Sequence, residues 1–185
     1  MSIILADFSD PVEKRKERLV AVKKEAVYKD IDLLTHKHVD GSDIPSPRIS
    51  NARSSDTEED VDGAVLARYV EFRDAQLRAR IQFALSDKWQ EEASSRITQE
   101  QECYVYHLSV PESFNDNALR PLAEYIHRFL VWGALYDWYA QFDQRQASVY
   151  GSQIEDLEDE ITSLLQTPAI VKRPMQPFGP ARRIF

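Results

Sequence analysis

The sequence has few of the residues that build tight turns, disulfides or membrane spans. Glycine occurs 5 times and cysteine once in 185 residues. Folds rich in hairpins, and loops that cradle phosphate, need more glycine than this. The single cysteine, Cys103, cannot form a disulfide within the chain. No apolar run approaches the ~20 residues that span a bilayer. The apolar patch at residues 3–5 lacks a preceding basic region and is not a signal peptide, so we expect synthesis and folding in a cytoplasm, with no membrane partner.

Positive charge is also scarce, and it is unevenly distributed. The chain has 23 Lys and Arg against 31 Asp and Glu, a net charge of -8. A protein that coats nucleic acid would carry the opposite sign. Four basic and no acidic side chains lie in residues 167–185, so residues 1–166 hold the other 19 basic and all 31 acidic ones. An acidic body with a basic tail can attract copies of itself or an acidic partner.

The first third of the chain is predicted to contain one helix and a linker. Ser9-Asp10-Pro11 is a good start signal for a helix over residues 11–37. The apolar stripe of this helix is narrow, so the helix needs a partner surface. The stripe consists of Val20, Val27, Ile31 and Leu34. Residues 38–56 contain Gly41, Pro45 and Pro47 among polar residues and are predicted to be a linker.

Residues 57–166 are predicted to form the body, an antiparallel helical bundle. A capping-box pattern at residues 57–60 opens a long second helix. The segment 116–142 is apolar on most sides, which is typical of a central helix. The helix 144–166 has a heptad seam opposite an acidic face, so it should pack antiparallel against the central helix. The seam comprises Ala147, Tyr150, Ile154, Leu157, Ile161 and Leu164.

One segment has the period of a strand. Residues 104–110 alternate Tyr104, Tyr106, Leu108 and Val110 with more polar residues, and Pro111 ends the pattern. Its pairing partner is either a weak strand near Ser95–Thr98 or another subunit. The fold class is therefore mainly α: an antiparallel helical bundle with one short β segment and extended terminal arms. The chain divides into an N-terminal helical segment (1–37), a linker (38–56), a body (57–166) and an arm (167–185).

The arm combines prolines, basic residues and apolar anchors. Pro168, Pro174, Pro177 and Pro180 exclude a helix and favour an extended chain. A solvated tail would not need the apolar side chains that accompany them. We therefore expect the arm to dock on a partner and to have little independent order in an isolated subunit. The residues predicted to bind partners are Lys172, Arg173, Pro174, Met175, Phe178, Arg182, Arg183, Ile184 and Phe185.

The histidines and the cysteine do not form a convincing site. His36 and His38 lie at a predicted helix end with no third metal ligand, so solvated side chains are the simpler interpretation. Cys103 and His107 on one strand would be ~13 Å apart, which is too far for a nucleophile and its base. His127 is best explained as a buried histidine bonded to Glu124 or to a backbone carbonyl. A third hypothesis is an enzyme that uses His127 and Glu124.

Two further clusters have simpler structural explanations. The acidic run at 155–160 lacks the glycine-bearing loop of a calcium site, so it is interpreted as a solvated face that can also meet the basic arm of a neighbouring copy. No basic residues interleave with the aromatic cluster, so core packing is favoured over base stacking. That cluster is Trp132, Tyr136, Trp138 and Tyr139. We therefore predict no catalytic, metal or cofactor site, and a protein that is not an enzyme.

The order of elements in residues 104–178 resembles a known family. The elements are YVYHLSVP (104–111), IHRFLVWGALYDWY (126–139), an acidic helix, and VKRPMQPF (171–178). Together they are similar to neck or ring proteins of crAss-like tailed bacteriophages, and more broadly to head-to-tail connector adaptors. The resemblance covers a little under half of the chain. The known adaptors are mostly helical, so the strand at 104–110 is a departure.

The resemblance implies a virion protein of the neck, assembled in the host cytoplasm. Many copies, twelve in the family, would form a ring below the portal protein and beside adjacent ring proteins. The arm would embrace the portal, and genome DNA would pass non-specifically through the lumen. An acidic lumen is physically reasonable, because like charge stops DNA from sticking. The alternative is a cytoplasmic helical scaffold or regulator whose tail docks on one partner without a ring.

Overall fold

The computed structural model describes residues 14–38, 61–86 and 102–166 of the chain. These residues form four α-helices and a two-stranded antiparallel sheet, so the predicted mainly α class is confirmed. The elements are β1 (Arg15–Lys23), α1 (Lys24–His38), α2 (Val61–Arg80), β2 (Cys103–Pro111), α4 (Leu119–Phe142) and α5 (Gln144–Gln166), with short 3₁₀ turns at Gln82–Ala84 and Asp116–Ala118.

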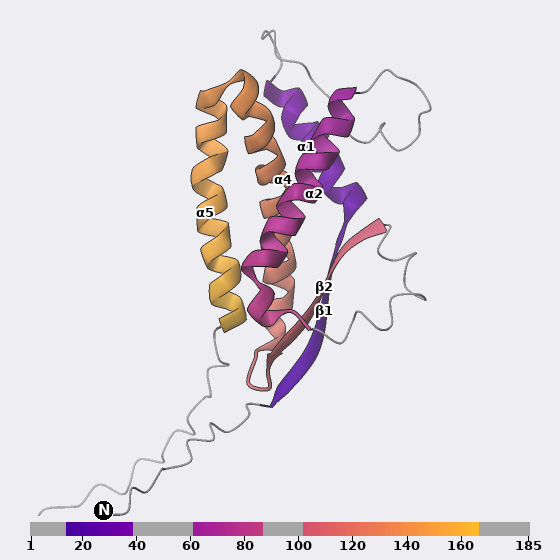
Figure 1. Cartoon of the computed structure of the whole chain (residues 1–185), viewed down its shortest axis with the longest axis vertical. Coiled ribbons are helices and arrows are strands. Elements are labelled where there is room, and N and C mark those ends of the chain that lie inside the picture. Colours follow the sequence, from indigo (N-terminus) through magenta and orange to yellow (C-terminus); the bar gives the residue numbers. More distant parts are fainter. Residues whose placement is uncertain (1–13, 39–60, 87–101, 167–185) are drawn as a thin grey trace, which may run out of the picture.

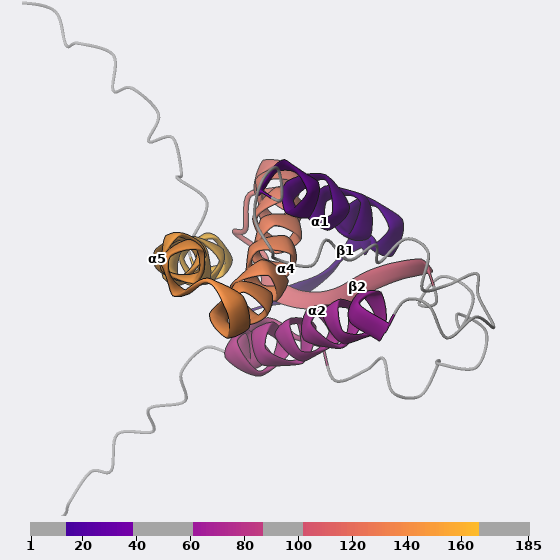
Figure 2. The ribbon, with the colours of Figure 1, turned by 90° about the horizontal axis from the view of Figure 1, so that it is seen from above.

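Helix α4 lies at the centre of the molecule. Helix α5 covers one side of it, and α1, α2 and the sheet cover the other, as the two views show (Figures 1 and 2). Ten of its 24 residues are buried, among them Leu122, Ile126 and Leu130 with no exposed surface. The prediction that the apolar segment 116–142 is the core helix is thus confirmed.

Helices α4 and α5 form an antiparallel pair across a tight turn. The Asp143 carboxylate accepts hydrogen bonds from the backbone N–H groups of Arg145 (2.9 Å) and Gln146 (3.2 Å), which caps the start of α5. The predicted seam is buried from Ala147 to Ile161, but its last member is Leu165 rather than Leu164. Leu164 is half-buried. A single straight helix repeats every 3.6 residues, so a strict heptad drifts off the contact line.

The first predicted helix is wrong in its first half. Residues Arg15–Lys23 form strand β1, and only Lys24–His38 are helical. Within β1, buried Val20 and Val22 alternate with exposed Leu19 and Ala21. This alternation is a strand period that the dense charge on either side obscures. Tertiary pairing with β2 decides the outcome, because mixed-charge residues have little preference of their own for a strand.

Strand β1 is also the missing partner of the predicted strand. It pairs along its whole length with β2, with Val20 opposite Tyr106 and Val22 opposite Tyr104. The prediction that this strand pairs with another subunit or with residues 95–98 is therefore wrong for this edge of β2. Residues 95–98 themselves lie outside the described residues. The other edge of β2 meets Leu85 in a single bridge opposite Leu108.

The apolar stripe of α1 has the partner surface it needs. Val27 and Ile31 are completely buried and belong to the same core as α2 and α4. Residues that precede the predicted body thus contribute to its core. The predicted linker, apart from His38, and the predicted arm at 167–185 lie outside the described residues.

Candidate interaction surfaces

The predicted partner-binding residues, all between 172 and 185, lie outside the described part of the chain, so they stay predictions. His36 and His38 fall in the last turn of α1. Cys103 and His107 are both half-buried on the same face of β2. Within the described residues, no group of three or more His, Cys, Asp or Glu side chains could hold a metal ion. None of the described helices is long and apolar enough to cross a membrane.

His127 has a different partner from the one expected. Its Nε2 atom lies 2.8 Å from the carboxylate of Asp30 on α1, so the contact joins α1 to α4. Glu124 instead lies 3.5 Å from Arg120, one turn earlier on the same helix. The sequence could not identify Asp30, because the contact depends on how α1 packs across α4.

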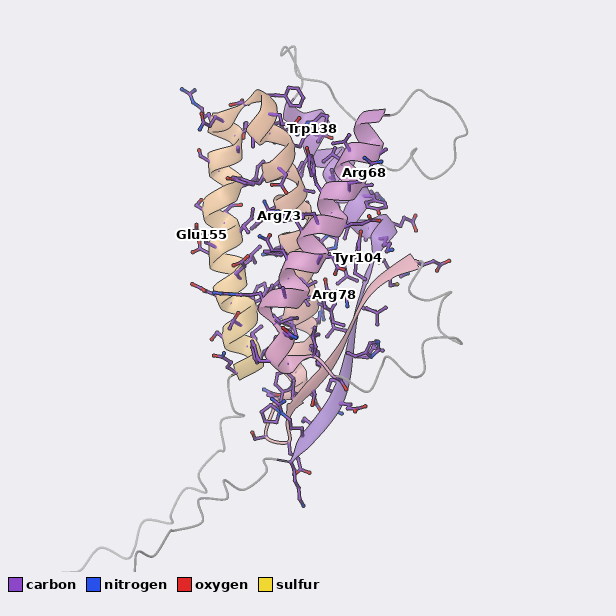
Figure 3. All side chains as sticks on the ribbon, in the orientation of Figure 1. Arg68, Arg73, Arg78, Tyr104, Trp138 and Glu155 are labelled. Atoms are coloured by element: carbon purple, nitrogen blue, oxygen red, sulfur yellow. The ribbon has the colours of Figure 1, made fainter. Side chains whose placement is uncertain are left out.

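The acidic run forms an uncompensated face on α5. Four of its carboxylates are exposed and Glu158 is half-buried. The exposed four are Glu155, Asp156, Asp159 and Glu160. None of the five forms an ion pair with another described residue. This face points away from α4, on the outside of the molecule, as the position of Glu155 in Figure 3 shows.

The aromatic cluster is divided between core and surface. Trp138 and Tyr139 are buried, which confirms core packing for these two. The Tyr139 ring stacks on Tyr150 of α5 with centroids 6.0 Å apart, and burial raises the pKa of Tyr139 to about 12. Trp132 and Tyr136 are half-buried. Tyr136 lies under the guanidinium of Arg73, 5.4 Å from its ring centroid.

Arg73 joins α2 to α4 through a buried ion pair that the sequence did not indicate. Its guanidinium binds both carboxylate oxygens of Asp137, at 2.8 and 2.6 Å, and also donates to Gln76 at 2.9 Å. Gly133 leaves room for this side chain, since a Cβ atom there would lie 2.7 Å from Arg73 Cγ. Paired and hydrogen-bonded in this way, Arg73 holds two helices together rather than binding a ligand.

A second polar cluster joins α2 to the sheet. The Tyr106 hydroxyl donates to Asp74 at 2.5 Å, and Arg78 binds the same carboxylate at 2.8 Å. Arg78 also lies over the Tyr106 ring and donates to the Val105 carbonyl at 3.0 Å. Burial is the main cause that raises the pKa of the Tyr106 hydroxyl. The labelled residues Arg73 and Arg78 mark these two clusters in Figure 3.

A third cluster fastens β1 to the 3₁₀ turn that precedes α4. Asp116 accepts two hydrogen bonds from Arg18, each of 2.9 Å, and lies 3.0 Å from Lys16. The hydrogen bonds from Arg18 and then those from Lys16 hold the pKa of Asp116 far below its usual range. All three clusters are satisfied internally, so they contribute to structure.

A groove between β1, α1 and α4 is also open at the surface. One hollow of about 400 Å³ is lined by small residues, Ala21, Ala26 and Ala123, together with the side chains of Lys23 and Arg128. A second hollow of about 270 Å³ shares His127 and Arg128 with the first and continues along α1 and α4. Its lining includes the larger apolar side chains of Leu33, Leu34, Val131 and Trp132, together with Asp30.

Basic side chains outnumber acidic ones in the first hollow, where Lys23, Arg120 and Arg128 accompany Glu124, and the second hollow holds Asp30 beside Arg128. Lys23 and Arg128 form no ion pair with any other described residue, and Arg120 has only the 3.5 Å contact with Glu124. Sequence reasoning missed this surface completely, because its two walls are more than ninety residues apart in the chain. The only local signal is alanine at exposed or half-buried positions, and many surface helices share that feature.

Within the described residues, two surfaces thus carry charges without ion-pair partners, the acidic face of α5 and the groove between β1 and α4, where Lys23 and Arg128 are unpaired. They lie on different sides of the central helix (Figure 2). A scan against protein-family models found no match, and neither a search of curated proteins nor one of solved structures matched this chain.

Proposed function

We propose that this chain is a structural assembly subunit, joined to its neighbours by its basic arm, and that it has no catalytic role. The observation that carries the proposal is the outer face of α5. Five carboxylates between residues 155 and 160 have no cationic partner among the described residues, and the arm begins immediately after the helix that bears them.

The charges of the two segments are complementary. The arm has four basic and no acidic side chains, and α5 has only one basic residue, Arg145, at its start. Single exposed ion pairs stabilise by ~1 kcal/mol or less. Several pairs formed at once, together with apolar anchors such as Met175 and Phe178, bind far more tightly when many copies repeat the contact.

The finer proposal rests on the resemblance to neck proteins. In that form, copies of the chain build a ring that docks below a portal protein, the arm grips the portal or the next subunit, and the acidic surface borders a DNA channel. Like charge between such a surface and DNA would keep the genome from adhering while it moves.

Deletion of residues 167–185 tests the proposal. The truncated protein should keep its helical circular dichroism spectrum and lose association with its own copies or with a co-expressed portal, as measured by light scattering after gel filtration. Normal assembly of the truncated protein would refute the role of the arm. Complex size separates the alternatives, because a ring subunit forms a high-order complex and a scaffold with one partner forms a small stoichiometric one.

A charge-reversal pair tests the acidic face. Glu155→Lys with Asp159→Lys should weaken arm-dependent association at least tenfold, because like charges would then face each other. Glu25→Lys with Glu112→Lys is the matched control, since it changes net charge equally at exposed positions on α1 and beside β2. Equal losses in both pairs would show that only net charge matters, and the acidic face of α5 would then not be the docking surface.

A further inference from the structure

Strand β1 has an unpaired edge. The backbone N–H of Glu112 donates to the Lys14 carbonyl at 2.9 Å, which sets the phase of the antiparallel ladder. Because bonded and non-bonded pairs alternate in such a ladder, the even-numbered residues of β1 bond to β2. The backbone groups of Leu19 and Ala21 therefore point the other way. Among the described residues, only β2 pairs with β1.

The groove runs along this free edge. Its wall on the strand side is formed by residues 21–23, and its opposite wall is the first half of α4. An unpaired strand edge beside a helix, with a hollow between them, is the geometry in which an extended peptide adds as a further strand. Its main chain bonds to the edge while alternate side chains enter the hollow.

The lining of the groove selects the chemistry of such a peptide. The small side chains of Ala21, Ala26 and Ala123 leave space for large apolar side chains. Glu124 is the one carboxylate in the lining of the first hollow and lies 3.5 Å from Arg120, so Lys23 and Arg128 remain to favour carboxylates of an occupant at the rim. The occupant should therefore be extended, apolar and acidic, with no proline in the paired stretch, because proline cannot donate to the ladder. These requirements argue against the basic, proline-rich arm.

Residues 2–10 of this chain meet each requirement. They read SIILADFSD, with four large apolar side chains, two carboxylates, no basic residue and no proline. Ile3 and Ile4 are β-branched, which suits a strand. The stretch has nine residues, and so has β1.

The short connection between residues 2–10 and β1 favours donation of this segment to another copy. Because Lys14 already bonds to Glu112, only Pro11, Val12 and Glu13 remain to turn the chain back onto its own β1. A three-residue hairpin loop needs a left-handed residue, usually glycine, and this loop has none. A segment that cannot fold back onto its own strand stays available to a neighbouring copy, where the short connection no longer dictates its direction.

We propose that residues 2–10 of one copy add as a strand to the free edge of β1 in a neighbouring copy and fill the groove between β1 and α4. The added segment runs parallel to β1, so that its C-terminal end, with Asp7 and Asp10, comes to the Lys23 end of the strand, beside Arg128. This contact is separate from the docking of the arm on α5, and it holds whether or not that proposal does.

Cross-linking of mixed isotopic copies of the full-length protein tests the exchange directly. Equal amounts of ¹⁴N and ¹⁵N protein are unfolded, mixed and refolded, then treated with a carbodiimide, which condenses a carboxylate with a lysine amine to an amide, with net loss of one water. Mass spectrometry should find Asp7 or Asp10 joined to Lys23 in peptides of mixed isotope. Lys29, exposed on α1 beyond the groove, should not react. Links only within one isotope, or no link to Lys23, would overturn the proposal.

A binding measurement provides a second, independent test. A fluorescent peptide of residues 2–10 is titrated into the full-length protein carrying Ala123→Trp, which fills the hollow, or Ala79→Trp, which changes an exposed position on α2. The unlabelled protein serves as competitor. Ala123→Trp should weaken binding at least tenfold, and Ala79→Trp should leave it unchanged. Equal affinity in both variants would place the peptide elsewhere and refute the groove as its site.

Discussion

Arg73 places a charge in the interface between α2 and α4, where 8% of the residue is exposed. We expect Asp137→Ala to lower the free energy of unfolding by about 3 kcal/mol, because it leaves the guanidinium buried without its bidentate partner. Arg68→Ala, an exposed arginine on the same helix, should change stability by about 0.5 kcal/mol or less. Urea denaturation measures both. A cost for Asp137→Ala as small as that of the control would show that water already solvates Arg73.

Gly133 and Gly151 give contrasting predictions on neighbouring helices. Alanine raises helix propensity by about 1 kcal/mol at either site. At Gly133 the added Cβ would lie 2.7 Å from Arg73 Cγ, on a side chain held at its far end by Asp137. At Gly151 it would lie 3.1 Å from the ring of Tyr136.

Gly133→Ala should therefore destabilise by about 1–3 kcal/mol despite its propensity gain. Gly151→Ala should be close to neutral, because a small movement of the Tyr136 ring relieves the contact. Thermal unfolding of both variants compares them directly. A Gly133→Ala protein more stable than the parent would contradict the close packing of Arg73 against α4.

Buried tyrosines predict a loss of stability at alkaline pH. Burial raises the pKa of Tyr139 to about 12, against about 10 in an unfolded chain. The folded state therefore keeps the proton that the unfolded state loses. The resulting stabilisation is fully present below pH 10 and is lost as the pH rises toward 12. Urea denaturation from pH 8 to pH 11.5 should show this decline, and Tyr139→Phe should make it shallower. An unchanged slope in the variant would rule out this tyrosine as a contributor.

At the scale of elements, α4 carries most of the fold. Ile126→Asp should unfold the protein or cost more than about 4 kcal/mol, because it buries an unpaired charge at a position with no exposed surface. Ala140→Asp, exposed near the end of the same helix, is the matched control. Circular dichroism and urea denaturation distinguish the two. A cooperatively folded Ile126→Asp protein with near-parent stability would mean that the core lies elsewhere.

The elements that the sequence predicted best have strong periodicity of their own. The all-round apolarity of 116–142 and the seam of 144–166 are local patterns, so they could be read without knowledge of any partner. Strand β1 has only two buried valines among charged residues, and the same residues fit a weak helical stripe. Its identity depends on pairing with β2, more than eighty residues later, and no local pattern encodes that contact.

At the scale of the whole molecule, the uneven charge predicts salt-sensitive assembly. Residues 1–166 have an excess of 12 acidic side chains, and residues 167–185 have four basic and no acidic ones. Association through the arm should weaken as sodium chloride rises from 50 to 500 mM, because the screening length falls from roughly 14 to 4 Å. Analytical ultracentrifugation across this series measures the effect. Association that strengthens with salt would indicate an apolar contact instead.

The sequence by itself determined the mainly α class, the central helix, its antiparallel partner and the separation of charge between body and arm. Each follows from composition or from a period within one segment. Only the tertiary structure decided the pairing of β1 with β2, the Arg73–Asp137 contact, the His127–Asp30 contact and the groove beside the free edge of β1. These features join residues that are far apart in the chain, and they depend on the angle and register at which the elements pack.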